Sequence, residues 1–174
     1  MLNKRIEKLT IGILDDAGIK SLPVPVDEIA KKRGLTIKPY DLGENVSGVL
    51  VMDSGKGTIG INPTESKVRQ RFTIAHELGH YELHKQDSGL FIDKEFKMLF
   101  RDQNSSKGEI RKEQEANAFA AAILMPEKLL IKEIKNQNFD LTDEASMKEL
   151  AKTFNVSVPA MTFRIANLNL FWKI

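Results

Sequence analysis

The sequence predicts an α+β protein that is mainly helical and contains a small antiparallel β-sheet. Helical spacing of apolar residues begins near the N-terminus and recurs along most of the chain. Between residues 46 and 62, two runs of strand-forming residues flank a turn-forming segment, as in a β-hairpin. A length of 174 residues suits one domain of ordinary size with a small appendage.

The composition is that of a globular protein and excludes several classes. Basic and acidic residues number 26 and 24, and this near balance gives no footprint for a general nucleic-acid or membrane-surface binder. The chain has no cysteine, which excludes disulfides and thiolate metal ligands. The N-terminal segment lacks the apolar stretch of a signal peptide, and no run approaches the roughly 20 apolar residues of a membrane span. We therefore expect a cytoplasmic protein.

The first third of the chain is expected to contain two helices and three strands. Residues 2–17 repeat apolar positions at helical spacing. Residues 21–34 turn through two prolines into a short helix that Gly34 ends. Residues 35–40 predict a strand, and the β-hairpin follows at residues 46–62.

A long helix is predicted next, from Asn62 to about His84. Asn62 can cap this helix, Pro63 suits its first turn, and Glu65 occupies the third helical position. Residues 85–108 are rich in charged and small polar residues. They predict a long loop that contains a short strand or helix.

Helices dominate the remainder. Residues 109–125 predict an alanine-rich helix that ends or kinks before Pro126. Further helices are expected at about 127–136, 143–153 and 158–168. Because the helical pattern breaks near residues 136–140, we expect a main domain at residues 1–136 and a C-terminal helical segment at residues 137–174.

The segment "TIAHELGHYELH", residues 73–84, contains all three histidines of the chain. Its centre, "HELGH", matches H-E-x-x-H, the zinc-hydrolase signature on a helix. His76 and His80 lie about 40° apart around a helix axis and about 6 Å apart along it, so both imidazoles can reach one cation. Glu77 projects beside them, where it can take a proton from a metal-bound water whose pKa zinc lowers toward about 7. The segment therefore predicts a zinc site with Glu77 as catalytic base.

Two questions about this segment stay open in the sequence. A short motif also occurs by chance, and the stretch would then be a surface helix without metal, although its apolar neighbours favour burial. His84 lies on the same face as the other histidines, but about 12 Å along the axis from His76, which is too far for one ion with metal–nitrogen distances of about 2 Å. We expect His84 either to hydrogen-bond one of the metal-binding residues, without binding the ion itself, or to lie at the surface.

A third ligand is expected from another helix, as in sites built of two histidines and a glutamate. Residues 109–125 offer Glu109, Glu113 and Glu115. On a helical wheel, Glu113 lies within about 60° of the centre of the apolar stripe and Glu115 about 100° away, which favours Glu113 and leaves Glu115 as the alternative. Asn117, one turn after Glu113, can hydrogen-bond a ligand. The small residues of "AFAAA" allow this helix to pack close beside the histidine helix.

Three blocks of the sequence together resemble the ImmA/IrrE family of bacterial and phage metallopeptidases. They are "VPVDEIAKKRGL", "INPTESKVRQRFTIAHELGHYELH" and "RKEQEANAFAAAILMP", and they recur in that order within residues 20–130. The resemblance implies a zincin-like metallopeptidase domain of gluzincin type. It also implies one Zn²⁺ per chain, held by His76, His80 and Glu113, with Glu77 as the catalytic base.

The same resemblance implies a function and a partner. Members of the family cleave a helix-turn-helix transcriptional repressor or an antitoxin-like regulator, and thereby induce phage, mobile-element or stress genes. The chain is therefore expected to be a zinc metalloendopeptidase with a protein substrate of this kind. The alternative is a non-catalytic zinc-containing regulator that binds a repressor or DNA. The intact H-E-x-x-H weighs against it, because a purely structural zinc site has no need of Glu77.

The C-terminal segment is similar to the helix-turn-helix segment that often follows this core, with two helices around "FNVS" and Ser157 as a cap. Its basic residues are balanced by acidic ones and make no basic footprint. They are Lys148, Lys152, Arg164 and Lys173, set against Asp143, Glu144 and Glu149. We therefore expect these helices to pack on the core or to dock the substrate, and we expect no direct DNA binding.

Two further expectations concern the substrate. Hydrolysis of a peptide bond forms a tetrahedral oxyanion, and the candidate donors to it, besides the metal, are His84, Tyr81 and Arg71. Residues 57–62, "GTIGIN", are a candidate strand edge for an extended peptide, since β-addition is a common mode of peptide binding.

Overall fold

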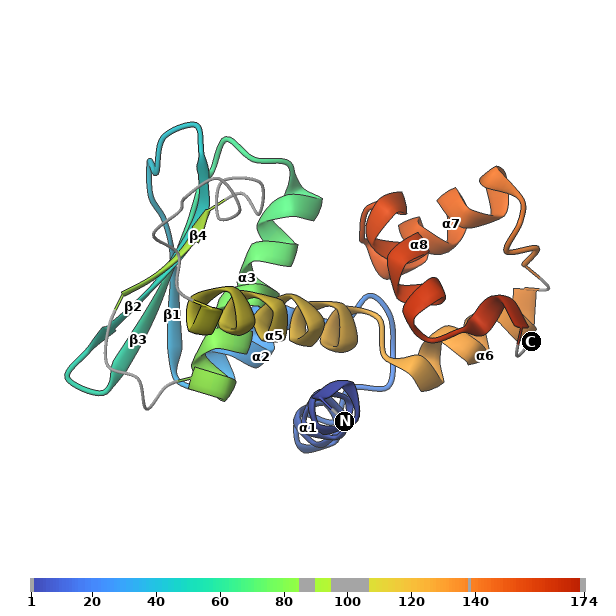
Figure 1. Ribbon diagram of the computed structural model, residues 1–174, viewed down its shortest axis with the longest axis horizontal. Coiled ribbons are helices and arrows are strands. Elements are labelled where there is room, and N and C mark those ends of the chain that lie inside the picture. The colour runs from blue at the N-terminus through green and yellow to red at the C-terminus, as the bar shows by residue number, and fades with distance from the viewer. Residues whose placement is uncertain (1, 85–89, 95–106, 138, 173–174) are drawn as a thin grey trace.

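The computed structural model describes residues 2–84, 90–94, 107–137 and 139–172 and confirms the α+β class. The elements follow one another as α1 (Leu2–Asp16), α2 (Val26–Lys32), β1 (Leu35–Pro39), β2 (Val46–Asp53), β3 (Lys56–Ile61), α3 (Lys67–His84), β4 (Leu90–Lys94), α5 (Lys107–Leu124), α6 (Glu127–Gln137), α7 (Glu144–Phe154), α8 (Val158–Asn167) and the 3₁₀ helix η1 (Leu170–Trp172). Figure 1 shows the sheet at one end, α3 and α5 in the middle, and α6, α7 and α8 at the other end.

The sheet has the strand order β1-β3-β2-β4 and is mixed, which corrects the prediction of an antiparallel sheet. β3 runs antiparallel to β2 but parallel to β1, with Ile37 opposite Ile59. The chain reverses direction after Pro39 and again in the hairpin, so β3 returns in the direction of β1 and fits between β1 and β2. Because β3 is an interior strand, the prediction that residues 57–62 present an edge is wrong.

The predicted hairpin is formed by β2 and β3. Its turn residues, Ser54 and Gly55, have φ angles of 48° and 81°. Positive φ at both central residues matches the twist of the flanking strands, and glycine adopts it without strain. The short element predicted within residues 85–108 is the strand β4, which pairs antiparallel with β2. Residues 85–89 and 95–106 lie outside the described part of the chain.

Helix α3 begins at Lys67, five residues after the predicted cap Asn62. The Asn62 side chain binds the loop instead, because its amide donates to the carbonyls of Gly43 and Val46 and its oxygen accepts from Thr64. Ser66 takes the capping role and accepts from the backbone N–H of Arg69. The predicted start was therefore wrong, because the tertiary contacts of Asn62 outweigh its local capping preference.

Helices α3 and α5 cross at close range (Figure 1). A Cβ added to Gly79, inside "HELGH", would lie 3.1 Å from the Cβ of Phe119 and 3.2 Å from the Cα of Ala116. Leu78, on α3, and Phe119 are fully buried beside this crossing. Glycine and alanine at the crossing thus let the two backbones approach each other, as the small residues of α5 predicted.

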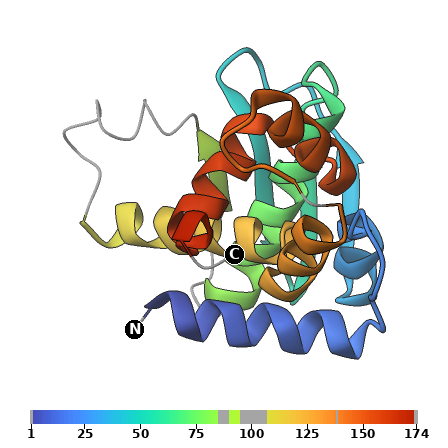
Figure 2. The same ribbon diagram turned by 90° about the vertical axis from the view of Figure 1, so that its right-hand side faces the viewer.

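The C-terminal helices are tied to the rest by Arg164, which is only 5% exposed. Its Nε donates to the carbonyl of Met125, the residue after α5, and its guanidinium pairs with Glu7 on α1. Figure 2 shows α1 running along one side of the molecule. Arg164 is therefore a buried anchor and not part of an exposed basic surface. Ser157 caps α8 as predicted, accepting from Ala160 N–H.

Helix α6 ends at Gln137, close to the boundary predicted near residues 136–140. The division into two domains stays a prediction. Among the described helices, none has both the length and the apolar character needed to cross a bilayer.

Candidate metal centre

The H-E-x-x-H segment lies in the buried half of α3, between the sheet and α5. His76 and His80 are each 1% exposed, and Glu77 is fully buried. This is the opposite of a surface helix with solvated histidines. The apolar neighbours that favoured burial in the sequence, such as Ala75 and Leu78, are themselves buried in the core.

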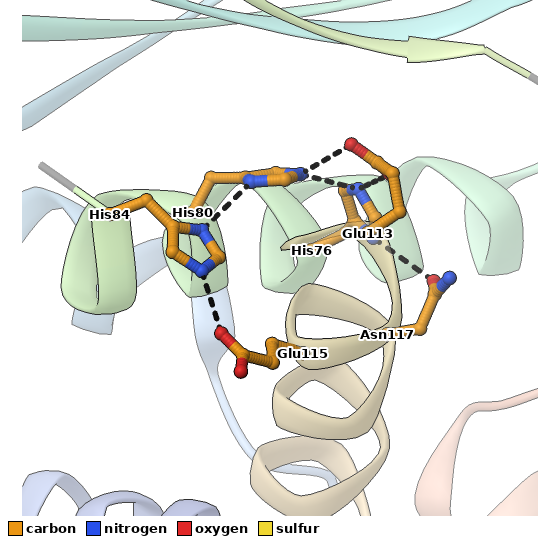
Figure 3. A network of polar contacts seen from close by, with 6 residues as sticks. All are labelled: His76, His80, His84, Glu113, Glu115 and Asn117. Atoms are coloured by element: carbon orange, nitrogen blue, oxygen red, sulfur yellow. Dashed lines mark hydrogen bonds and ion pairs between the residues drawn. The ribbon is translucent and has the colours of Figure 1, made fainter. Parts of the chain in front are cut away.

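Glu113 of α5 joins the two histidines in a compact triangle, drawn in Figure 3. The Nε2 atoms of His76 and His80 are 3.0 Å apart. Glu113 places Oε2 at 3.1 Å from His76 Nε2 and Oε1 at 3.0 Å from His80 Nε2. Tetrahedral ligands with bonds of about 2.0–2.1 Å to zinc are about 3.3 Å apart, so the triangle has nearly the size that such an ion requires. Two imidazole nitrogens and one carboxylate also form a donor set that suits zinc.

In His76 and His80, the ring nitrogen that faces away from the triangle, Nδ1, also forms a hydrogen bond. His76 Nδ1 lies 3.0 Å from Asn117 Oδ1, an amide oxygen that can only accept, so His76 donates this bond. His80 Nδ1 lies 3.3 Å from His84 Nδ1. Bonds of this kind fix the ring orientation and tautomer of metal-binding histidines. Asn117 was predicted in this role, and His84 either in this role or at the surface.

Glu113 and Glu115 occupy different positions around α5, as the wheel predicted. Glu113 faces His76 and His80, and its side chain is 12% exposed. Glu115 instead accepts from His84 Nε2 at 2.9 Å and from Arg111 Nε at 3.0 Å. The geometry thus brings Glu113, and not Glu115, to the two histidines.

The cluster is electrostatically prepared for a cation. Burial raises the pKa of the Glu113 carboxyl, but hydrogen bonds with His76 and His80 outweigh it and bring the pKa from 4.5 down to about 2. Burial lowers the pKa of the His80 imidazole below its usual 6.5, against an opposing hydrogen bond with Glu113. At neutral pH the cluster therefore offers an ionised carboxylate and a neutral His80 imidazole, the forms that bind metal.

The patterns in the sequence did not identify Gly48, which lies in β2 next to Glu77. A Cβ added there would lie 2.2 Å from Thr73 Cγ2 and 3.4 Å from Glu77 Oε1. Thr73 lies one turn before Glu77 on the same helix. The strand therefore comes so close to Thr73 that an added Cβ would clash with its methyl group, and it also brings the backbone of Gly48 into contact distance of the Glu77 carboxylate. An isolated glycine within a predicted strand was the available signal.

We expect Gly48→Ala to lower the free energy of unfolding by about 1–3 kcal/mol, because the new methyl overpacks the contact between β2 and α3. Thr73→Ser removes the Cγ2 atom that the methyl would strike. The double variant should therefore be more stable than the sum of the two single effects predicts. Urea denaturation of the metal-free proteins measures all four corners of this cycle.

The control for this cycle is Gly12→Ala. Gly12 lies on α1 with no heavy atom within 4 Å of an added Cβ, so alanine should leave stability unchanged or increase it. Strictly additive losses at Gly48 and Thr73 would contradict the proposed clash.

Two other predicted candidates, Arg71 and Tyr81, are not brought to the cluster by the contacts that the structure describes. The Arg71 guanidinium donates to the carbonyl of Val24, just before α2. Tyr81 packs against the hydrophobic core. Their suggested role as oxyanion donors stays a prediction without geometric support.

Sequence comparison relates this chain to known proteins. Residues 30–166 match the model of the IrrE N-terminal-like domain, a peptidase family. The metallopeptidase ImmA of Bacillus subtilis (strain 168) is 29% identical over 147 residues, which make up 84% of this chain and 78% of ImmA. The uncharacterized immunity region protein 2 of Bacillus phage phi105 is 30% identical over 120 residues, or 69% of this chain and 70% of that protein.

Structural comparison gives a further match, at the level of the fold. A transcriptional regulator of Mycobacterium tuberculosis matches with a TM-score of 0.60 and 16% identity, over 95% of this chain. The match covers only 46% of that regulator, so this chain spans less than half its length. The likeness concerns the fold alone. The resemblance predicted from the motifs is confirmed by the matching family model, and the chain belongs to the ImmA/IrrE family of IrrE N-terminal-like peptidase domains.

Proposed function

We propose that the chain is a zinc-dependent metalloendopeptidase, in which His76, His80 and Glu113 hold one zinc ion and Glu77 is the catalytic base. The buried triangle of the first three residues carries the proposal, because its size and donor atoms suit zinc. The relationship to the metallopeptidase ImmA supports it independently.

The chemistry divides between the ion and the chain. When bound, zinc supplies Lewis-acid chemistry, since it lowers the pKa of a water molecule and polarises a substrate carbonyl. Glu77 lies between the two histidines in the helix, and its carboxylate accepts the proton of the attacking water. The same group then delivers this proton to the amide nitrogen, which leaves as an amine. Close packing of Gly48 and Thr73 beside Glu77 restricts where its carboxylate can lie.

The position of strand β4 is an argument for a protein substrate. It occupies the end of the strand order next to β2 and packs near α3, which carries the histidines. An extended peptide can add to such a strand through backbone hydrogen bonds. We propose that the substrate is a helix-turn-helix repressor or an antitoxin-like regulator. Two relatives, a metallopeptidase and a phage immunity region protein, are consistent with this choice.

The test is cleavage of candidate helix-turn-helix repressors and antitoxin-like regulators from the same genome. The purified zinc-loaded protein is mixed with each candidate regulator, and the products are identified by intact mass. We expect one or a few defined cuts, loss of cleavage after dialysis against a chelator, and its return with added zinc. Cleavage that survives complete metal removal would contradict the proposal.

The same assay separates the alternative function, a non-catalytic zinc-containing regulator. That alternative predicts zinc binding and complex formation with the regulator, but no cut products. The presence of a buried glutamate, Glu77, directly after His76 in the helix favours the enzyme, since a purely structural zinc site needs only its ligands.

A further inference from the structure

His84 links the candidate metal centre to a second carboxylate. One nitrogen of its ring, Nδ1, lies 3.3 Å from Nδ1 of His80. The other nitrogen, Nε2, lies 2.9 Å from Glu115 Oε2. Arg111 Nε donates to the other oxygen of Glu115 at 3.0 Å. Figure 3 shows His80, His84 and Glu115 in a continuous chain.

This series of hydrogen bonds runs from the interior of the protein to its surface. His80 is 1% exposed and His84 7%, whereas the side chains of Glu115 and Arg111 are 13% and 71% exposed. The inner bonds are therefore shielded from water. A polar atom of His80 or His84 that lost its partner there would be costly.

The carboxylate determines where each proton lies. An ionised carboxylate only accepts hydrogen bonds, so His84 must donate from Nε2. A neutral His84 then has a lone pair on Nδ1, which accepts from His80 Nδ1–H. A neutral His80 with its proton on Nδ1 has a lone pair on Nε2, the atom that would bind the ion. In the metal-free protein the ionised Glu113 carboxylate, 3.0 Å from the same Nε2, favours the opposite tautomer, so Glu113 and the bond to His84 compete for the proton of His80.

We infer that Glu115, acting through His84, selects the tautomer of His80 whose Nε2 can bind the metal. The inference rests on the zinc site of the proposed function, and it makes His84 and Glu115 positioning residues. Glu115 is thereby excluded as a ligand but retained as part of the centre. Asn117 gives His76 the same tautomer by a single direct bond.

Histidine tautomers test the inference without metal. Nitrogen chemical shifts of isotope-labelled histidine distinguish Nδ1–H from Nε2–H in the zinc-free protein. The measurement uses a Glu113→Ala background, which removes the competing carboxylate at His80 Nε2. We expect His80 protonated on Nδ1 and His84 on Nε2 in Glu113→Ala, and a mixed population at His80 when Glu115→Leu is added. His80 protonated on Nε2 in Glu113→Ala, or an unchanged His80 tautomer when Glu115→Leu is added, would overturn the inference. The result does not depend on whether the chain binds zinc or cleaves a protein.

Zinc affinity, measured by competition with a chromophoric chelator, is the second readout. Loss of an outer hydrogen-bond partner typically weakens metal binding about 10–100-fold, and we expect this for Glu115→Leu and His84→Leu. Glu115→Gln and His84→Asn keep an acceptor oxygen, so they should retain most of the affinity. The control is Glu109→Leu, an exposed glutamate on the same helix, which should bind zinc as the wild type does.

The outcomes are distinguishable. Equal zinc affinity in Glu115→Leu and the wild type would overturn the inference while leaving the zinc site intact. A wild type that binds no zinc would contradict the proposed function instead, and the tautomer measurement would still decide the inference. If His84→Leu fails to fold, as circular dichroism would show, the Glu115 variants give the answer.

Discussion

Replacing Glu77 by glutamine is expected to lower the rate of substrate cleavage by about 10²–10⁴-fold, the usual contribution of a general acid–base residue. The amide has nearly the size and shape of the carboxylate, so it should fit between β2 and α3. It cannot accept a proton from water and pass it on, and the loss should therefore appear in kcat. The measurement is the rate of appearance of cut regulator under single-turnover conditions.

The controls separate catalysis from metal binding and from folding. Glu77→Gln should bind zinc as tightly as the wild type, because Glu77 is not one of the three converging donors. Glu82→Gln makes the same chemical change on the same helix, at a residue that pairs with Arg33, and should cleave at nearly the wild-type rate. Cleavage by Glu77→Gln at the wild-type rate would remove Glu77 from the mechanism.

Local periodicity was enough to predict the spatial arrangement of the cluster. The i, i+4 spacing of His76 and His80 fixes two nitrogens on one helix face, whatever the rest of the fold does. A second periodicity favoured Glu113 over Glu115 but left both open, since the apolar stripe of α5 must face the core and Glu113 lies within about 60° of its centre. The small residues of α5 likewise predicted a close helix crossing, and the structure has it at Gly79 and Ala116.

Features that depend on tertiary contacts could not be predicted in this way. The parallel pairing of β1 with β3 depends on which strand fills the place beside β1, and hairpin rules do not specify it. Asn62 has the chemistry of a helix cap, but distant carbonyls of Gly43 and Val46 take its amide. Gly48 became notable only when β2 was placed against Glu77.

The roles assigned to Glu113 and Glu115 show the same difference between what local periodicity predicts and what depends on tertiary contacts. Distance along the helix excluded His84 as a ligand, but it gave no reason to connect His84 with Glu115, which lies 31 residues later. That connection exists because α3 and α5 cross at close range, and the side chains behind the triangle then meet each other. The pair Glu113 and Glu115 therefore allows a sharp test of the site.

Glu113→Gln is expected to weaken zinc binding by more than about 100-fold, which is beyond the loss typical of an outer hydrogen-bond partner. In free energy this exceeds about 2.7 kcal/mol. The wild-type carboxylate, whose pKa is held at about 2 by His76 and His80, is ionised at every pH at which the protein would bind zinc. The amide has no charge to offer the cation, and it presents an N–H group if it turns the wrong way.

Glu115→Gln is the matched variant, since it makes the same change two residues further along α5. It keeps an acceptor for His84, so its zinc affinity should stay near that of the wild type. Chelator competition at neutral pH measures both affinities, and cobalt substitution adds a readout of the ligand set, because loss of a ligand changes the visible spectrum. A larger loss in Glu115→Gln than in Glu113→Gln would reverse the assignment of the third ligand. Such a result would require the α5 side chains to rearrange when the ion binds, since within the described part of α5 it is Glu113 that reaches both histidines.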